Sequence, residues 1–316
     1  GASAVIAELS ASPVYYVRTI FTRTLTVDAM WRAAPSRHGH VTSFMSTRTP
    51  SAIGRTDPVR RRSGFSRAIV GRLSTSTAGV RGTPNPAPTP APTPTPKPAP
   101  AGIAVPSTID STGATDVSAA LISFVGSVPD GSTIVFKAGG VYRLNAALKF
   151  AHRHNLTFEG NGATLKAGGG TTEASSLFWL GSYLGGNTGI VIRNFTIEGN
   201  NPNTGNSTTP GVFQVGREGA HGVLVDGGST IDVSNVTVRG VWGDCFYVGG
   251  WADGVSFHDS TCSSNGRNGV TVTSARNLTV QRVAFPKAGY CTFDIEPNIS
   301  SEGASNIRFL DNTAGS

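Results

Sequence analysis

Four short apolar segments recur at a nearly constant spacing in the second half of the chain. They begin 23, 24 and 23 residues apart, at 222–225, 245–248, 269–272 and 292–295. In each one, apolar residues stand at alternate places, which is the pattern of a strand with one buried face. A fixed short period of strands indicates a solenoid, in which each repeat packs on its neighbours.

A second series of strand-like segments is interleaved with the first. Its apolar pairs recur at 24, 23 and 29 residues and extend backwards across longer gaps; they are Leu156/Phe158, Ile190/Ile192, Ile231/Val233, Val255/Phe257, Leu278/Val280 and Ile307/Phe309. Two series with one shared period describe a coil traced about six times. We therefore expect an all-β fold, a parallel β-helix solenoid of about six coils.

The repeats can be aligned residue by residue. One expected interior column consists of Ile192, Val233, Phe257, Val280 and Phe309. Next to a predicted turn lies a polar column of Asn194, Asn235, Asp259, Arg282 and Asp311. Stacked amides at such a bend can hydrogen-bond along the axis. Only the first two members are Asn, so the sequence does not predict a full ladder.

Charge divides the chain into unlike parts. Residues 1–100 carry 13 Lys and Arg against 3 Asp and Glu, whereas residues 101–316 carry 13 against 16. The net charge of +7 therefore belongs to the first third. No aromatic residues are interleaved with the basic ones as a stacking platform, so the sequence does not favour nucleic acid as a partner.

Composition divides the chain into three regions. Residues 1–82 are basic and lack sustained periodicity, so we expect a disordered segment, a mis-assigned start or a wall- or membrane-surface segment. The apolar stretch 12–30 is broken by charges, so no transmembrane segment is predicted, and no signal peptide is visible. Residues 83–100 alternate proline with other residues and predict a stiff linker, typical of exported proteins that hold a domain away from a wall.

The third region, residues 101–316, is the expected β-helix domain. Thr115-Asp116 offers a helix cap, and the apolar residues that follow predict a short amphipathic helix closing the N-terminal end of the solenoid. The chain stops a few residues after a strand with no equivalent device, so we expect further coils beyond it.

Several motifs resemble a known superfamily. Residues 113–116, 129–132 and 139–144 (GATD, PDGS and GGVYRL) resemble the opening of pectin-lyase-like right-handed β-helix proteins. The motifs 268–272 (NGVTV) and 293–298 (FDIEPN) are similar to right-handed β-helix repeat proteins of that superfamily. The resemblance covers 107–316 and implies a right-handed coil. The superfamily includes lyases, hydrolases, epimerases, tailspikes and adhesins, so the fold does not choose among them.

The polygalacturonase branch of that superfamily places carboxylates, a His and an Arg/Lys pair on successive coils at one sheet edge. The corresponding column here holds His221, Asp244, Asn268 and Cys291. Gly243-Asp244-Cys245 is similar to that family's Asp-Asp-Cys but has one carboxylate, and the Arg/Lys pair is absent. These departures argue against a polygalacturonase.

Outward-facing polar residues supply the candidate site. Asp294 and Glu296 flank the inward-facing Ile295, so their carboxylates should project from one face about 7 Å apart. Such a pair could act as acid and base in glycoside hydrolysis or bind a cation. We predict Asp244, Asp294, Glu296 and His221 as catalytic, and Tyr247, Arg267, Asn268, Thr271, Asp226 and Trp242 as substrate-binding. The alternative is that these are solvated outward residues and turn caps.

The predicted function is that of an extracellular carbohydrate-active protein whose partner is a polysaccharide, with uronate-containing polymers the leading class. A lyase, a hydrolase and an epimerase remain open, and the rival is a noncatalytic adhesin or tailspike-like binder. Its expected location is outside the cell or attached to the wall or envelope through the N-terminal stalk. No metal ligand set is predicted, and Ca²⁺ remains an open alternative because no dense Asp cluster marks a site.

The three cysteines predict no disulfide. Cys262 falls in an interior column and should be a buried thiol, whereas Cys245 and Cys291 lie two coils apart. Two coils span about 9.6 Å, too far for a bridge.

Overall fold

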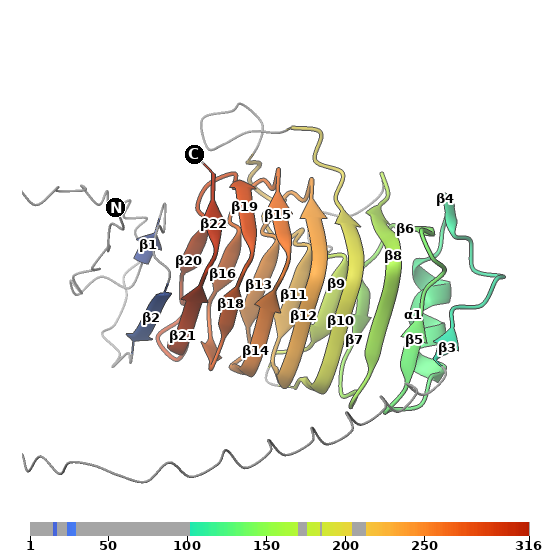
Figure 1. Cartoon of the computed structure of the whole chain (residues 1–316), viewed down its shortest axis with the longest axis horizontal. Helices are drawn as coiled ribbons and strands as arrows, with labels where there is room; N and C mark the ends of the chain where they lie inside the picture. The colour runs from blue at the N-terminus through green and yellow to red at the C-terminus, as the bar shows by residue number, and fades with distance from the viewer. Residues whose placement is uncertain are drawn as a thin grey trace, which may run out of the picture. The chain divides into compact units, whose positions relative to one another are not determined.

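The computed structural model describes residues 15–17, 24–29, 102–169, 176–183, 185–203 and 213–315. The expected linker 83–100 and nearly all of the basic segment 1–82 lie outside these ranges. Figure 1 shows the strands stacked one behind another in two long sheets. The neighbouring strands of consecutive coils run parallel, as a coiled chain requires.

The smaller sheet contains one strand from each coil. Along the axis its parallel members are β7 (Leu148–Phe150), β9 (Phe178–Gly181), β11 (Val223–Asp226), β13 (Phe246–Gly249), β16 (Val270–Val272) and β20 (Phe293–Ile295). Four of these strands are the repeats at 222–295 that the sequence predicts. Six coils in this sheet confirm the predicted all-β parallel β-helix.

The larger sheet carries the second series. Its members between the two ends are β8 (Thr157–Ala167), β10 (Asn187–Glu198), β12 (Gly228–Arg239), β14 (Ala252–His258), β15 (Thr261–Ser263), β17 (Ala275–Arg276), β18 (Thr279–Gln281), β19 (Ala284–Lys287), β21 (Ala304–Leu310) and β22 (Thr313–Ala314). The strand β12 pairs with β14 through its first half and with β15 through its last three residues. The sheet therefore bends within each coil.

The bend coincides with the predicted turn column. Asn194, Asn235, Asp259, Arg282 and Asp311 all have left-handed backbone conformation, with φ between 50° and 63°. Asn tolerates this conformation better than most residues because its short polar side chain bonds locally. Asn235 Nδ2 donates to Asn194 Oδ1 at 2.5 Å, and beyond these two the ion pair of Asp259 with Arg282 continues the stack. The stack thus contains one amide pair and one ion pair, in place of a full ladder of amides.

The interior column is also confirmed. The residues Ile192, Val233, Phe257, Val280 and Phe309 are paired in register from β10 to β21. Each is at most 2% exposed. Because alternate side chains of a strand point to opposite faces, the intervening residues point outward and are available for a site.

A helix covers the N-terminal end. The helix α1 (Ser118–Ser127) lies beside β3 (Ile103–Ala104), β4 (Thr112–Asp116), β5 (Thr133–Val135) and β6 (Val141–Leu144), as Figure 1 shows. It buries Leu121 and Val125 and so closes the first coil, as predicted. Its N-cap residue is Val117, but Asp116 Oδ1 accepts the backbone NH of Ser118 at 3.0 Å and thus satisfies the first turn.

Two strands lie within the segment for which the sequence shows no periodicity. β1 (Tyr15–Val17) pairs antiparallel with β20, and β2 (Thr24–Ala29) pairs antiparallel with β21. Both add to the strands of the last coil. A strand of only three to six residues that pairs with a single neighbour has few alternating positions. Its period is therefore too short to be recognised from the sequence.

Candidate functional site

The candidate site lies where strands of the smaller sheet begin. The turns before β11, β13, β16 and β20 are stacked by backbone bonds from Gly222 to Asp244, from Cys245 to Asn268 and from Gly269 to Cys291. These bonds place His221, Asp244, Asn268 and Cys291 on four successive coils, which is the column that the sequence predicts. The outward residues Tyr247, Thr271 and Asp294 are in register in the adjoining strands.

Asp244 is the most enclosed member of this group. Its side chain is fully buried, and its Oδ1 accepts the backbone NH of Asn268 at 2.7 Å. Its Oδ2 lies 3.1 Å from Arg267 Nη1 and 3.3 Å from His221 Nδ1. Burial raises the pKa of Asp244 to about 6, and the Arg267 charge opposes that rise.

His221 is held in its neutral form. Its Nδ1 accepts the backbone NH of Asp244 at 3.0 Å, so the ring proton is on Nε2. Burial lowers the pKa of His221 to about 3, and the nearby Arg267 charge acts in the same direction. The ring stacks on Tyr247 with 4.6 Å between centroids. The contact between His221 and Asp244 is therefore not an ion pair near neutral pH.

Arg267 joins the buried carboxylate to the outward pair. Its Nη1 contacts Asp244, and its Nη2 forms an ion pair with Glu296 Oε1. Against the effect of burial, Asp244 and then Glu296 hold the pKa of Arg267 above its ordinary value. The Arg267 and Glu296 side chains each remain 20% exposed. One guanidinium therefore links the coil before its own to the coil after it and reaches the surface.

Asp294 favours its protonated form. Its side chain is only 1% exposed, and its Oδ1 accepts no hydrogen bond from the described residues. Its Oδ2 accepts from Asn268 Nδ2 at 3.2 Å. Burial raises the pKa of Asp294 to about 8, and the charge of Glu296 adds to the rise. The predicted pair thus consists of one carboxyl that keeps a proton at neutral pH and one that is paired with Arg267.

The other predicted residues lie in the cluster, at its margin or outside it. Asn268 also donates to Thr271 Oγ1 at 2.9 Å, and the Tyr247 hydroxyl accepts from Asn298 at 3.5 Å, so these side chains join the cluster. Trp242 lies at its margin, where its Nε1 donates to Asn200 and Arg217 stacks on its ring. Asp226 is not in the cluster. It lies at the end of β11, where burial raises the pKa of its carboxyl and a hydrogen bond from Trp179 and the charge of Lys149 oppose that rise.

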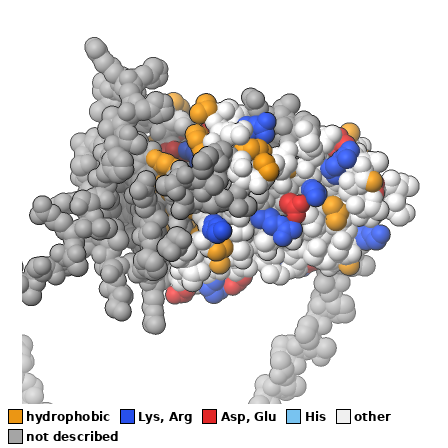
Figure 2. All heavy atoms as spheres, turned by 90° about the horizontal axis from the view of Figure 1, so that it is seen from above, with side chains coloured by type: hydrophobic (Ala, Val, Ile, Leu, Met, Phe, Trp, Pro, Cys, Tyr) orange, Lys and Arg blue, Asp and Glu red, His pale blue; other side chains and the backbone are white. Residues whose placement is uncertain are grey.

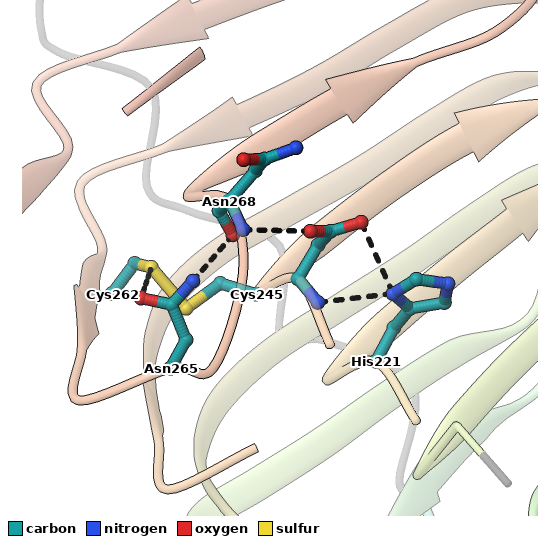
Figure 3. Close-up of a disulfide and its surroundings, with 6 residues drawn as sticks. His221, Cys245, Cys262, Asn265 and Asn268 are labelled. Carbon is teal, nitrogen blue, oxygen red and sulfur yellow. Dashed lines mark hydrogen bonds and ion pairs between the residues drawn. A yellow bond between two sulfur atoms is a disulfide. The ribbon is translucent and has the colours of Figure 1, made fainter. Parts of the chain in front are cut away.

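The prediction that the cysteines form no disulfide was wrong. Cys245 and Cys262 are bonded, with their Cα atoms 5.8 Å apart. Figure 3 shows the bridge beside Asn265, with Asn268 and His221 near it. Cys262 was expected to be a buried thiol, and only Cys245 and Cys291 were compared for distance. Cys245 enters the interior from one sheet and Cys262 from the other, within a single coil.

The disulfide lies directly behind the site. Cys245 follows Asp244 in the chain, and its NH donates to the Asn268 carbonyl at 3.1 Å. Asn265 Nδ2 donates to the same carbonyl at 2.6 Å. The two cysteines lie 17 residues apart within one repeat. Strand alternation gives Cys245 the same direction as the outward Tyr247, so the sequence did not mark Cys245 as an inward residue.

Metal binding gains no support from these positions. Among the described residues, no three His, Cys, Asp or Glu side chains form a group that could hold an ion. Asp244 and Glu296 bind the Arg267 guanidinium between them, so a positive charge already lies where a cation would bind. The geometry therefore does not fit Ca²⁺. No helix in the described ranges has the length and hydrophobicity to span a membrane.

Comparisons with known proteins return structures but no close relatives. No protein-family model matches the chain, and no curated protein matches it. Among solved structures it is similar to an endo-xylogalacturonan hydrolase from Aspergillus tubingensis, at 19% identity and a TM-score of 0.47, over 58% of this chain and 51% of that one. It is also similar to a candidate glycosyl hydrolase from Parabacteroides merdae, at 14% identity and a TM-score of 0.44, over 66% and 92%. The chain thus spans about half the length of the xylogalacturonan hydrolase.

Proposed function

We propose that the chain is a polysaccharide-acting glycoside hydrolase with Asp294 as its general acid and Glu296 as its second carboxyl. The observation that carries the proposal is the unequal state of the two carboxyls. Burial and the neighbouring charge raise the pKa of Asp294 to about 8, whereas Glu296 is paired with Arg267. A carboxyl that keeps its proton beside a second carboxyl is what glycoside hydrolysis needs.

The bond changes follow from these states. The Asp294 carboxyl gives its proton to the glycosidic oxygen as the bond from that oxygen to the anomeric carbon breaks. The Glu296 carboxylate either takes a proton from the attacking water or bonds to the anomeric carbon and is then displaced by water. Each route adds one water per bond cleaved. The anomeric configuration of the first product, read by NMR, separates the two routes.

The buried residues have positioning roles in this proposal. Asp244 holds Arg267, which forms the ion pair with Glu296, and Asn268 orients both Asp244 and Asp294 through its backbone NH and side-chain amide. His221 supports Tyr247 by stacking. Such groups act through the residues that touch substrate, so their loss should lower the rate without removing the acid or its partner.

Export is part of the same proposal. Disulfides persist in oxidising compartments and are rare in the cytosol. The bridge between Cys245 and Cys262 therefore favours a location outside the cytosol, as does the proline-rich stretch 83–100. Attachment to a wall or envelope through this stretch remains a proposal. The assay is the fraction of the native protein that is released from intact cells by mild proteolysis.

The test of activity uses the full chain with uronate-rich and neutral polysaccharides. We expect new reducing ends without the ultraviolet absorbance of unsaturated uronates. Asp294→Asn and Glu296→Gln should each lower the rate by at least about a hundredfold. Asp311→Asn is the matched control, because it replaces a carboxyl by an amide at an exposed turn where Asn is favourable.

Three results would contradict the proposal. Unsaturated products would indicate a lyase instead. Polymer retention without any cleavage would indicate the noncatalytic binder, in which the carboxylate network only shapes the face. Full activity in both site variants would place the chemistry elsewhere. A chelator should leave the rate unchanged, because Arg267 rather than a cation neutralises the carboxylates.

A further inference from the structure

The last coil of the described β-helix has neighbouring strands on both sides. The strand β20 pairs with β16 on one side and with β1 on the other, and β21 pairs with β18 on one side and with β2 on the other. Figure 1 shows β1 and β2 beyond this coil, at the end of the solenoid opposite to α1. The two short strands therefore cover the outer edge of the last coil.

The direction of β1 and β2 separates them from the coils. Neighbouring strands of successive coils pair in parallel, because the chain turns the same way in every coil. By contrast, β1 and β2 both run antiparallel to their partners. Addition of a separate strand to a sheet edge is a recurring mode of recognition, in which backbone hydrogen bonds supply the affinity. The pairing is thus a docking of one segment on another.

The last coil presents backbone groups on its outer edge. The Glu296 NH donates to the Val272 carbonyl at 2.9 Å and so faces β16. The Arg308 NH donates to the Leu278 carbonyl at 2.8 Å and so faces β18. Backbone groups alternate between the two sides of a strand. The residues whose backbone groups face outward, toward β1 and β2, are therefore Phe293, Ile295, Ile307 and Phe309.

The side chains of these four residues belong to the core. Each of them is at most 2% exposed. An uncovered end coil would leave both its core side chains and its edge amides in water. The chain therefore encloses this end of the solenoid, as α1 encloses the other.

The strand β2 matches this edge in register. Leu25 is the partner of Phe309, and Val27 is the partner of Ile307. Opposite residues of an antiparallel pair exchange both hydrogen bonds or neither. Because Ile307 and Phe309 face β2, we expect Leu25 and Val27 to bond to them through the backbone. Thr26, which lies between, should turn its NH away from the coil.

The docking segment is tied to the coil by the chain itself. The 72 residues 30–101 connect β2 to the β-helix domain, a length that can reach up to about 240 Å. The pairing is therefore intramolecular, and tethering gives effective concentrations of up to about millimolar. Two short strands that bind weakly by themselves remain docked under this condition. A single cut in the connection removes the advantage.

We propose that the outer edge of the last coil is a strand-docking site whose occupant is the chain's own segment 15–29, and that a cut between residues 30 and 101 releases it. On the face that Figure 2 shows, the described charged side chains form small separate groups, so backbone pairing rather than charge is the available basis for docking there. The inference goes beyond the proposed function and does not require it. Docking nevertheless adjoins the candidate site, because Tyr16 is the partner of Asp294.

The experiment cuts the folded full chain at one place. A site-specific protease sequence replaces part of the linker 83–100, and hydrogen exchange is read by mass spectrometry before and after cutting. On dilution of the cut protein, the outward amides of β20 and β21 should exchange at least about tenfold faster, and those of β12 in the middle of the solenoid should not change. Unchanged exchange at the edge, with the two pieces separated on a sizing column, would overturn the proposal.

Two proline substitutions test the docking in the uncut chain. Leu25→Pro removes an NH that should bond to β21, so exchange at Ile307 and Phe309 should rise at least about fivefold. Thr26→Pro is the matched control, because proline is tolerated on an edge strand where the NH faces solvent, and exchange should stay within about twofold. Unchanged exchange in both variants would overturn the proposal.

A synthetic peptide of residues 12–31 identifies the occupant. Added in excess to the diluted cut protein, it should restore slow exchange at the edge of the last coil. A peptide of the same composition in scrambled order should not. Slow exchange that returns on concentrating the β-helix piece alone would show that a second copy occupies the edge, and would overturn the assignment to 15–29.

Discussion

Arg267 Nη1 lies 3.1 Å from Oδ2 of Asp244, a carboxylate that is wholly buried one coil earlier. Breaking a buried ion pair by removing one partner leaves an uncompensated charge and typically costs several kcal/mol. Arg267→Met should therefore lower the free energy of unfolding by about 3 kcal/mol. Urea denaturation measures this change. In Asp244→Asn/Arg267→Met the loss should be smaller than in the single Arg267 variant, and an equal or greater loss would contradict the role of the pair.

The raised pKa of Asp294 predicts how the free energy of unfolding changes with pH, including the sign of the change. The carboxyl ionises near 3.8 when unfolded but near 8 in the folded chain. Between these values the folded state holds more protons, so the contribution of Asp294 to stability falls as the pH rises from about 4 to 8. Asp294→Asn should flatten this part of the curve of unfolding free energy against pH.

The same titration should appear in the rate. If Asp294 is the acid, kcat/KM falls as the pH rises through about 8, where the carboxyl of the free protein loses its proton. Tyr247→Phe should keep this descending limb, because the tyrosine is not the acid. A pH profile without a limb in this region would contradict the assignment of Asp294.

The disulfide predicts an effect of reduction on stability. Closing a loop of this size stabilises a fold by about 3 kcal/mol through the unfolded chain. Cys245→Ser/Cys262→Ser should therefore unfold at a lower urea concentration and lose most of its sensitivity to dithiothreitol. Alkylation after denaturation without reductant should modify Cys291 alone among the three cysteines, and mass spectrometry counts the labels. Three labels would exclude the bridge.

The turn column predicts a difference between two substitutions at one position. Asn235 has a φ of 51° and donates to Asn194. Asn235→Ala loses the bond and also the local polar side chain that makes the left-handed conformation tolerable, and should cost about 2 kcal/mol in unfolding free energy. Asn235→Gly loses the bond but tolerates the conformation, so it should cost about half as much. Equal losses would show that the conformation carries no penalty.

The sequence alone was sufficient to predict the repeat and its registers. Side chains alternate along every strand and coils stack at one spacing, so a period of 23 to 24 residues places Phe257 over Val233 and Val280 over Phe257 without further information. The outward positions of Asp294 and Glu296 follow from the same alternation. The column from His221 to Cys291 is equally a product of the period.

Only the tertiary structure decided which side chains form contacts across a coil or between one coil and the next. The disulfide joins two strand series whose separation depends on the bend of the sheet at residues such as Asp259, which no period specifies. The position of Arg267 between Asp244 and Glu296 depends on a turn and on side-chain rotamers. The complete burial of Asp244 and the proton on Asp294 depend on all the neighbouring groups together, because desolvation and charge act through space rather than along the chain.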